Sequence, residues 1–218
     1  MPLSASNPKK ENNRLRKDDF MKTKIWAVIS AALCILLFTS CSMGALMRQS
    51  SQKARAENSE ASSVVDADGN IQETRFFGTY TIPAGWTEAP EFSTDEKWFY
   101  VKDGTDLSSP TSNISVECGT NRYSADQHEA FRQAIVSQLA QQTSAAGSTS
   151  MTGTGTSTDA GDVLYVFTIE NSDGTTTIQY YIVGDKQYVM VHATDFYDEA
   201  IPDLQETARS IAYSFEWA

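Results

Sequence analysis

Two histidines, His128 and His192, are the candidates for acid–base chemistry in this chain. His192 alternates with Tyr188 and Met190, a pattern typical of one face of a strand, and Asp195 follows closely. A Ser-His-Asp hydrolase also needs a nucleophile on a sharp turn, and the chain has no Gly-x-Ser-x-Gly motif. We therefore expect His192 to be a sheet-face histidine and His128 to lie at the surface, and we predict no catalytic residues.

The motifs for metals and nucleotides are also missing from the sequence. Asp195, Asp198 and Glu199 gather three carboxylates, but they directly precede a helix expected from Pro202, where the helix dipole favours acids. The chain has no Cys-x-x-Cys, His-x-x-x-His or EF-hand pattern, and the glycine-rich stretch 152–156 lacks the lysine of a phosphate loop. We expect neither a metal ion nor a cofactor.

The three cysteines have different surroundings. Cys34 lies inside an apolar run, and Cys41 ends that run. Cys118 alternates with Ile114 and Val116, which predicts a buried thiol that packs as a small apolar residue and does not react.

Residues 21–41 have the build of a bacterial export signal, because Lys22 and Lys24 precede an apolar run that ends in small residues and Cys41. The ending Leu-Phe-Thr-Ser-Cys resembles a lipobox, in which the cysteine is lipidated and becomes the mature N-terminus. Phe38 departs from the pattern, since Leu, Val or Ile is usual there. We predict lipidation of Cys41, with two or more acyl chains giving stable attachment to the membrane.

An uncleaved membrane anchor is the alternative. The uncharged stretch 25–47 would form a helix of about 34 Å, longer than the roughly 30 Å hydrocarbon core. In both interpretations the basic residues upstream stay in the cytoplasm and the rest of the chain lies on the extracytoplasmic side. The polar residues 1–20 are either a cytoplasmic extension or the result of a start assigned upstream of Met21.

The chain carries a net charge of −11, and its acidic residues are concentrated after Cys41. Such a surface repels phosphate backbones, which excludes nucleic acid as a partner. The expected partners are the membrane, through the N-terminal segment, and another envelope protein.

The remaining chain divides by composition. Residues 42–73 are rich in Ser, Ala, Gln and acids, and they predict a flexible tether, while 74–218 predict a single folded domain. In this domain Asp173-Gly174 indicates a hairpin turn. The expected strands are 75–82, 97–102, 113–118, 150–156, 162–170, 175–183 and 187–194.

Two helices are predicted from capping and periodicity. Ser124 and Gln127 form a capping box, and the helix that follows has an apolar face. The second helix begins at Pro202. The inward residues are Phe131, Ile135 and Leu139 in the first helix and Leu204, Ala208 and Ile211 in the second. The order of elements predicts an α+β fold, with a mainly antiparallel sheet of about six or seven strands covered by two helices.

The sheet has more aromatic residues than one buried face requires. Trp98, Tyr100 and Tyr181 are the candidates for an exposed surface that binds a peptide, lipid or sugar. The alternative is ordinary burial of both sheet faces beneath the two helices.

Two stretches resemble the PsbP-like fold, which is shared by PsbP, the Mog-type Ran-binding proteins and several bacterial lipoproteins. They are Phe-Gly-Thr-Tyr-Thr-Ile-Pro-Ala-Gly-Trp at 77–86 and Ala-Arg-Ser-Ile-Ala-Tyr-Ser-Phe at 208–215. The resemblance implies an α/β/α sandwich and a scaffold that assists protein assemblies without catalysis. The family shares no catalytic residues, so none are transferred to this chain.

These observations predict a membrane-anchored extracytoplasmic lipoprotein that is not an enzyme and acts as a binding or assembly module. One alternative is a lipoprotein that binds a lipid or small solute in a cavity between sheet and helix. A further alternative is an envelope hydrolase.

Overall fold

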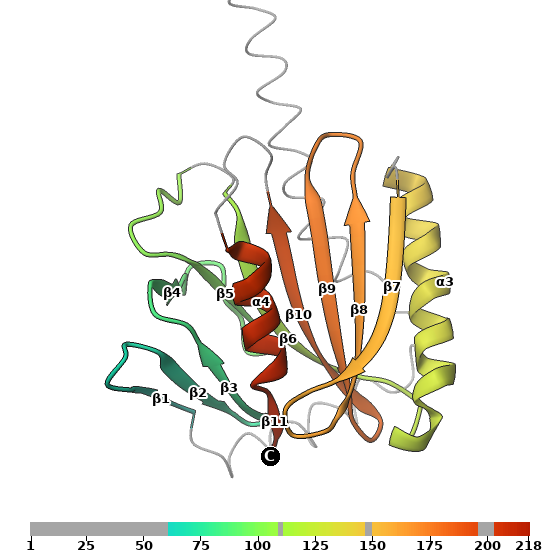
Figure 1. Ribbon diagram of the computed structural model, residues 1–218, viewed down its shortest axis with the longest axis horizontal. Helices are drawn as coiled ribbons and strands as arrows, with labels where there is room; N and C mark the ends of the chain where they lie inside the picture. Colours follow the sequence, from blue (N-terminus) through green and yellow to red (C-terminus); the bar gives the residue numbers. More distant parts are fainter. Residues whose placement is uncertain (1–60, 109–110, 147–149, 196–202) are drawn as a thin grey trace, which may run out of the picture. The chain divides into compact units, whose positions relative to one another are not determined.

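The computed structural model describes residues 61–108, 111–146, 150–195 and 203–218 (Figure 1). The expected extension 1–20, the segment 21–41 with Cys41, and tether residues 42–60 lie outside the described residues. The elements are β1 (Ser62–Val65), β2 (Ile71–Arg75), β3 (Gly78–Ile82), β4 (Trp86–Glu88), β5 (Lys97–Lys102), β6 (Asn113–Thr120), the 3-10 turn η1 (Ala125–Gln127), α3 (His128–Ala146), β7 (Ser150–Ser157), β8 (Val163–Glu170), β9 (Thr176–Val183), β10 (Gln187–Asp195), α4 (Leu204–Tyr213) and β11 (Glu216–Trp217).

Two antiparallel sheets organise the domain. The larger sheet has seven strands in the order β4-β5-β6-β10-β9-β8-β7, and the smaller has four in the order β1-β2-β3-β11. The predicted hairpin between β8 and β9 is present, with the N–H of Gly174 donating to the carbonyl of Asn171 at 3.2 Å. The α+β prediction is confirmed, since mainly antiparallel sheets are combined with two helices.

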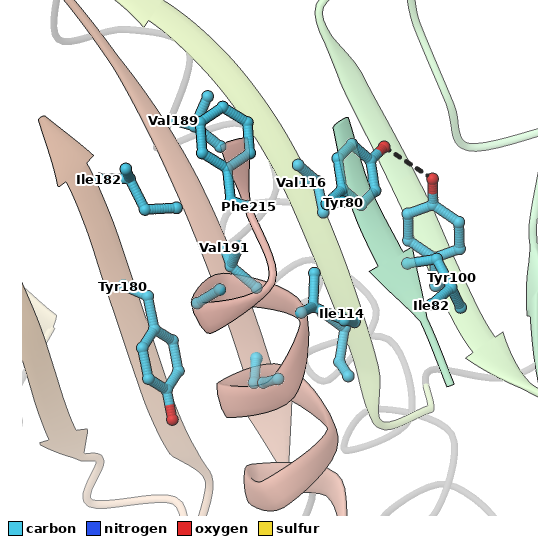
Figure 2. Close-up of a cluster of buried hydrophobic side chains, with 14 of the residues drawn as sticks. Tyr80, Ile82, Tyr100, Ile114, Val116, Tyr180, Ile182, Val189, Val191 and Phe215 are labelled. Atoms are coloured by element: carbon cyan, nitrogen blue, oxygen red, sulfur yellow. Dashed lines mark hydrogen bonds between the residues drawn. The ribbon is translucent and has the colours of Figure 1, made fainter. Parts of the chain in front are cut away.

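Helix α4 covers one face of the seven-stranded sheet, and the buried residues between them form what we call the α4-side core. The predicted inward residues Leu204, Ala208 and Ile211 are all buried there. Figure 2 shows the helix across strands β6, β10 and β9, with aliphatic side chains filling the space between. The sheet contributes mainly Ile114, Val116, Leu164, Ile178, Ile182, Val189 and Val191.

Helix α3 covers the opposite face and builds the α3-side core. Its predicted inward residues Phe131, Ile135 and Leu139 are buried, and Gln127 accepts a hydrogen bond from the N–H of Ser124 at 3.2 Å, as the capping box requires. The sheet side consists of Tyr165, Phe167, Ile169, Tyr181, Val183, Tyr188 and Met190. Because successive strand residues point to opposite faces, β9 and β10 contribute to both cores.

The small sheet differs from the sequence prediction in two ways. The stretch 75–82 was expected to be one strand, but β2 ends at Arg75 and β3 begins at Gly78. The expected tether 42–73 also ends earlier, because β1 and β2 form a hairpin over its last residues. Asp66 stabilises the turn of this hairpin by accepting hydrogen bonds from the N–H groups of Asp68 and Asn70. β1 and β2 are short and contain few large apolar residues, so composition alone indicated that residues 61–73 belong to a tether.

The carboxyl end of the chain completes the small sheet. Strand β11 pairs with β3, with Glu216 opposite Thr79 and Trp217 opposite Gly78. A Cβ atom at Gly78 would lie 2.2 Å from the carbonyl oxygen of Glu216 and 2.7 Å from the Phe215 ring. Only glycine therefore permits this close approach of the two strands.

Candidate functional site

The three aromatic residues predicted as a binding surface are buried. Trp98 is 7% exposed, Tyr100 0% and Tyr181 5%. Trp98 and Tyr100 belong to the α4-side core, whereas Tyr181 belongs to the α3-side core on the opposite face. The predicted surface is therefore not formed, and the alternative of burial on both faces holds for these residues. The small sheet accounts for much of this burial, because Phe77 and Tyr80 pack against Trp98 and Tyr100.

Tyr80 and Tyr100 join the two sheets through a buried hydrogen bond. Their hydroxyl oxygens lie 2.8 Å apart, as the dashed line in Figure 2 marks. Burial raises the pKa of both tyrosines above the usual range, so both remain protonated. The two hydroxyl groups thus satisfy each other's hydrogen bonding inside the α4-side core.

A charged cluster lies beside this tyrosine pair. The Nη2 atom of Arg75 is 2.8 Å from Glu73 Oε2 and 3.1 Å from Glu88 Oε2, and the guanidinium lies 4.9 Å from the centre of the Trp98 ring. Burial raises the pKa of Glu73, although Arg75 acts in the opposite direction. Ser63 donates a further hydrogen bond to Glu73 at 2.9 Å. The cluster thus connects β1, β2, β4 and β5 and has a structural role.

His192 lies on a sheet face, as predicted. Across the neighbouring strands it is opposite Ser115 and Gln179, and all three are buried. Burial, together with the positive charge of Lys97, lowers the pKa of His192 to about 3. The imidazole is therefore neutral near pH 7.

A second histidine cluster escaped the sequence prediction. Tyr165 donates a hydrogen bond to Glu129 Oε2 at 3.0 Å, and His128 Nδ1 lies 2.8 Å from the Tyr165 hydroxyl. A carboxylate only accepts, so the Tyr165 oxygen is left to accept from the Nδ1–H of His128. Burial and the bond to Glu129 raise the pKa of Tyr165 to about 12.

The His128 cluster therefore attaches the start of α3 to β8. Arg132 also pairs with Glu129, and this bond lowers the pKa of the carboxylate. No signal in the sequence marked the cluster, because Tyr165 lies far along the chain from the helix and reads as an ordinary strand aromatic.

The thiol and carboxylate groups give no further site. Cys118 is half-buried against the α4-side core, and burial raises the pKa of its thiol to about 12, so the thiol is protonated and unreactive. Within the described ranges, no three His, Cys, Asp or Glu side chains lie close enough to hold a metal ion. Neither described helix has the length and apolar character needed to span a bilayer.

The clearest exposed feature is strand β1. Val64 and Val65 are 59% and 65% exposed, and every residue of the strand is exposed. β1 is the outermost strand of the small sheet, and in the described part of the chain it pairs only with β2. We take β1 as the candidate interaction site. The signal that could have found it is Val64-Val65 and Ile71 flanking a polar Asp-Ala-Asp-Gly-Asn turn.

The chain is similar to the solution structure of cyanobacterial PsbP (CyanoP) from Synechocystis sp. PCC 6803, with 14% identity and a TM-score of 0.38. The match covers 72% of this chain and 92% of that one. No protein family matches the chain, and no curated protein matches it.

Proposed function

We propose that the described domain is a binding or assembly module without catalytic activity, and that residues 21–41 hold it on the extracytoplasmic side of a membrane. The observation that carries the proposal is the exposed edge of β1, with its two exposed valines. An extended segment of a partner protein can add a strand to such an edge, since backbone hydrogen bonds give affinity and side-chain contacts give specificity.

The support beneath β1 favours this role. Asp66 closes the turn of the β1–β2 hairpin, and Ser63 connects β1 to the buried Glu73–Arg75 pair. The edge strand is thereby attached to the core of the domain. A preorganised strand binds with a smaller entropic cost than a flexible segment.

The titratable groups also favour binding over catalysis. His192 is buried and neutral, and Cys118 is protonated. Tyr165 is engaged by His128 and Glu129. The surroundings of each group therefore account for its protonation state or its hydrogen bonds without a catalytic role.

Site-specific photo-crosslinking in intact cells tests the binding role. A photoreactive residue placed at Val64 is expected to give one adduct of defined mass. The same residue at Ser210, an exposed position on α4, is the matched control and is expected to give none. Identical adducts from both positions, or none from Val64, would contradict the proposed site.

Mass spectrometry of the membrane-extracted protein tests the anchor. Lipidation predicts a mature chain that begins at Cys41 with acyl groups, and Cys41→Ser should remain unprocessed. An uncleaved anchor predicts full-length protein in the membrane for both chains. Unprocessed protein found free in the cytosol would overturn both anchoring interpretations.

A further inference from the structure

The seven-stranded sheet also has a strand edge, at β7. This strand is the last of the seven-stranded sheet, and among the described strands it pairs with β8 alone (Figure 1). All eight of its residues are in register with β8, and every side chain except that of Met151 is exposed. β7 therefore presents a long, regular edge.

This edge has none of the usual protection against strand pairing. Edge strands are commonly guarded by charged residues, proline or bulges. From Gln133 to Thr158 no residue is charged and none is proline, although the chain as a whole carries a net charge of −11. The uncharged stretch includes most of α3, which packs on β8, the neighbour of β7.

Apart from Met151, the side chains of β7 are small. Gly153 and Gly155 lie opposite Phe167 and Tyr165. A Cβ atom at Gly153 would be 2.8 Å from the Phe167 ring, so the aromatic ring occupies the space of a side chain there. The other face carries Thr152, Thr154 and Thr156.

We propose that β7 pairs antiparallel with β7 of a second copy of this chain, joining two seven-stranded sheets across a two-fold axis perpendicular to the sheet. Opposed residues must then share a face, because antiparallel partners point to the same side. The register that matches the side chains places Thr154 opposite Thr154 and Thr152 opposite Thr156, with Gly153 opposite Gly155. Cross-strand threonine pairs of this kind stabilise a sheet.

The absence of charged residues on this edge lets a second copy of the acidic chain approach it. Two molecules with the same large negative charge repel each other over most of their surfaces. The β7 edge and the adjoining part of α3 bring no charges together, and the two-fold axis keeps both α3 helices on the same face of the joined sheet. An isologous interface needs one self-complementary patch, which the threonine and glycine alternation supplies.

Cysteine crosslinking of the full-length chain in native membranes tests the register. Thr154→Cys should form a disulfide with itself and give a product of twice the chain mass on a non-reducing gel, because opposed strand residues lie within disulfide distance. Thr152→Cys alone is the matched control and should stay monomeric, whereas Thr152→Cys combined with Thr156→Cys should crosslink. No product from Thr154→Cys, or an equal product from Thr152→Cys, would overturn the proposal.

Light scattering of the detergent-solubilised full-length chain tests the dimer independently. The unmodified chain should have twice the protein mass of Thr154→Lys, in which lysine enters the edge. Val64→Lys on β1 should retain the larger mass, so loss of the β1 partner and loss of the dimer are distinguished. A monomeric unmodified chain overturns the proposal, and circular dichroism verifies that Thr154→Lys is folded.

Discussion

The two faces of the seven-stranded sheet are buried in different ways. The α4-side core is mainly aliphatic and is closed by both α4 and the small sheet. The α3-side core is covered by α3 and consists largely of aromatic residues, while the same sheet face also carries the buried polar residues Ser115, Gln179 and His192. One set of strands thus supports a mainly aliphatic core on one face, and an aromatic core with buried polar neighbours on the other.

The largest expected difference comes from the same substitution on the two helices. Ile211→Ala should lower the free energy of unfolding by about 4 kcal/mol, because Ile211 is fully buried and its helix packs on both sheets, which should limit how far the cavity can collapse. Ile135→Ala should cost about 2 kcal/mol, since α3 packs on one sheet and can adjust. Urea unfolding measures both values. Equal costs, or a larger cost for Ile135, would refute the comparison.

The buried His192 on the α3-side sheet face should make the free energy of unfolding depend on pH. The pKa of His192 is about 3 in the folded chain and near 6.5 when unfolded, so its contribution is complete above pH 6.5 and is lost as the pH falls towards 3. Between pH 6.5 and 5 we expect a loss of roughly 1.5 kcal/mol. Urea unfolding across this range should show a flatter profile for His192→Gln. His128→Gln is the matched control, and equal flattening by both would refute the assignment.

A smaller effect concerns the tyrosine pair in the α4-side core. Tyr100→Phe leaves the buried hydroxyl of Tyr80 without its partner and should cost about 1 kcal/mol. Replacing both tyrosines with phenylalanine removes the unpaired group, so the double variant should be more stable than the single one. Thermal unfolding compares them, and additive losses would show that the bond is not the cause.

The smallest effect is expected outside both cores. Phe92 is 50% exposed, and Phe92→Ala should change the free energy of unfolding by less than about 0.5 kcal/mol. Urea unfolding measures this change. A loss comparable with that of Ile135→Ala would mean that the loop carrying Phe92 belongs to a third packing region.

The sequence predicted the elements whose signals are local. The apolar spacing of Phe131, Ile135 and Leu139 identified α3, and strict alternation or turn residues located the strands from β5 to β10. The start of β2 and the break at Phe76-Phe77 were missed, because no turn residue precedes Gly78 there. The position of the small sheet over Trp98 depends on contacts between distant segments, which local patterns do not contain.

The candidate sites were harder to predict for the same reason. The sequence showed an excess of aromatic residues in the sheet, including Trp98, Tyr100 and Tyr181. Only the fold shows that Trp98 and Tyr100 are buried in the α4-side core and Tyr181 in the α3-side core. The hydrogen bond between His128 and Tyr165 joins α3 to β8, which is distant in the sequence. The residues next to each of them in the sequence give no sign of this contact. The β1 edge was hidden because Val64 and Val65 are exposed and short strands resemble a linker.

The pairing of β3 with β11 constrains how the domain matures. These strands stand near opposite ends of the folded region, and the close approach at Gly78 requires both to be present. A polypeptide that emerges amino end first can form the β1–β2–β3 meander early. It can complete the small sheet only after β11 has left the ribosome or translocon. Ribosomal or translocon arrest before Glu216 would therefore leave Phe77 and its neighbours accessible to proteases and chaperones.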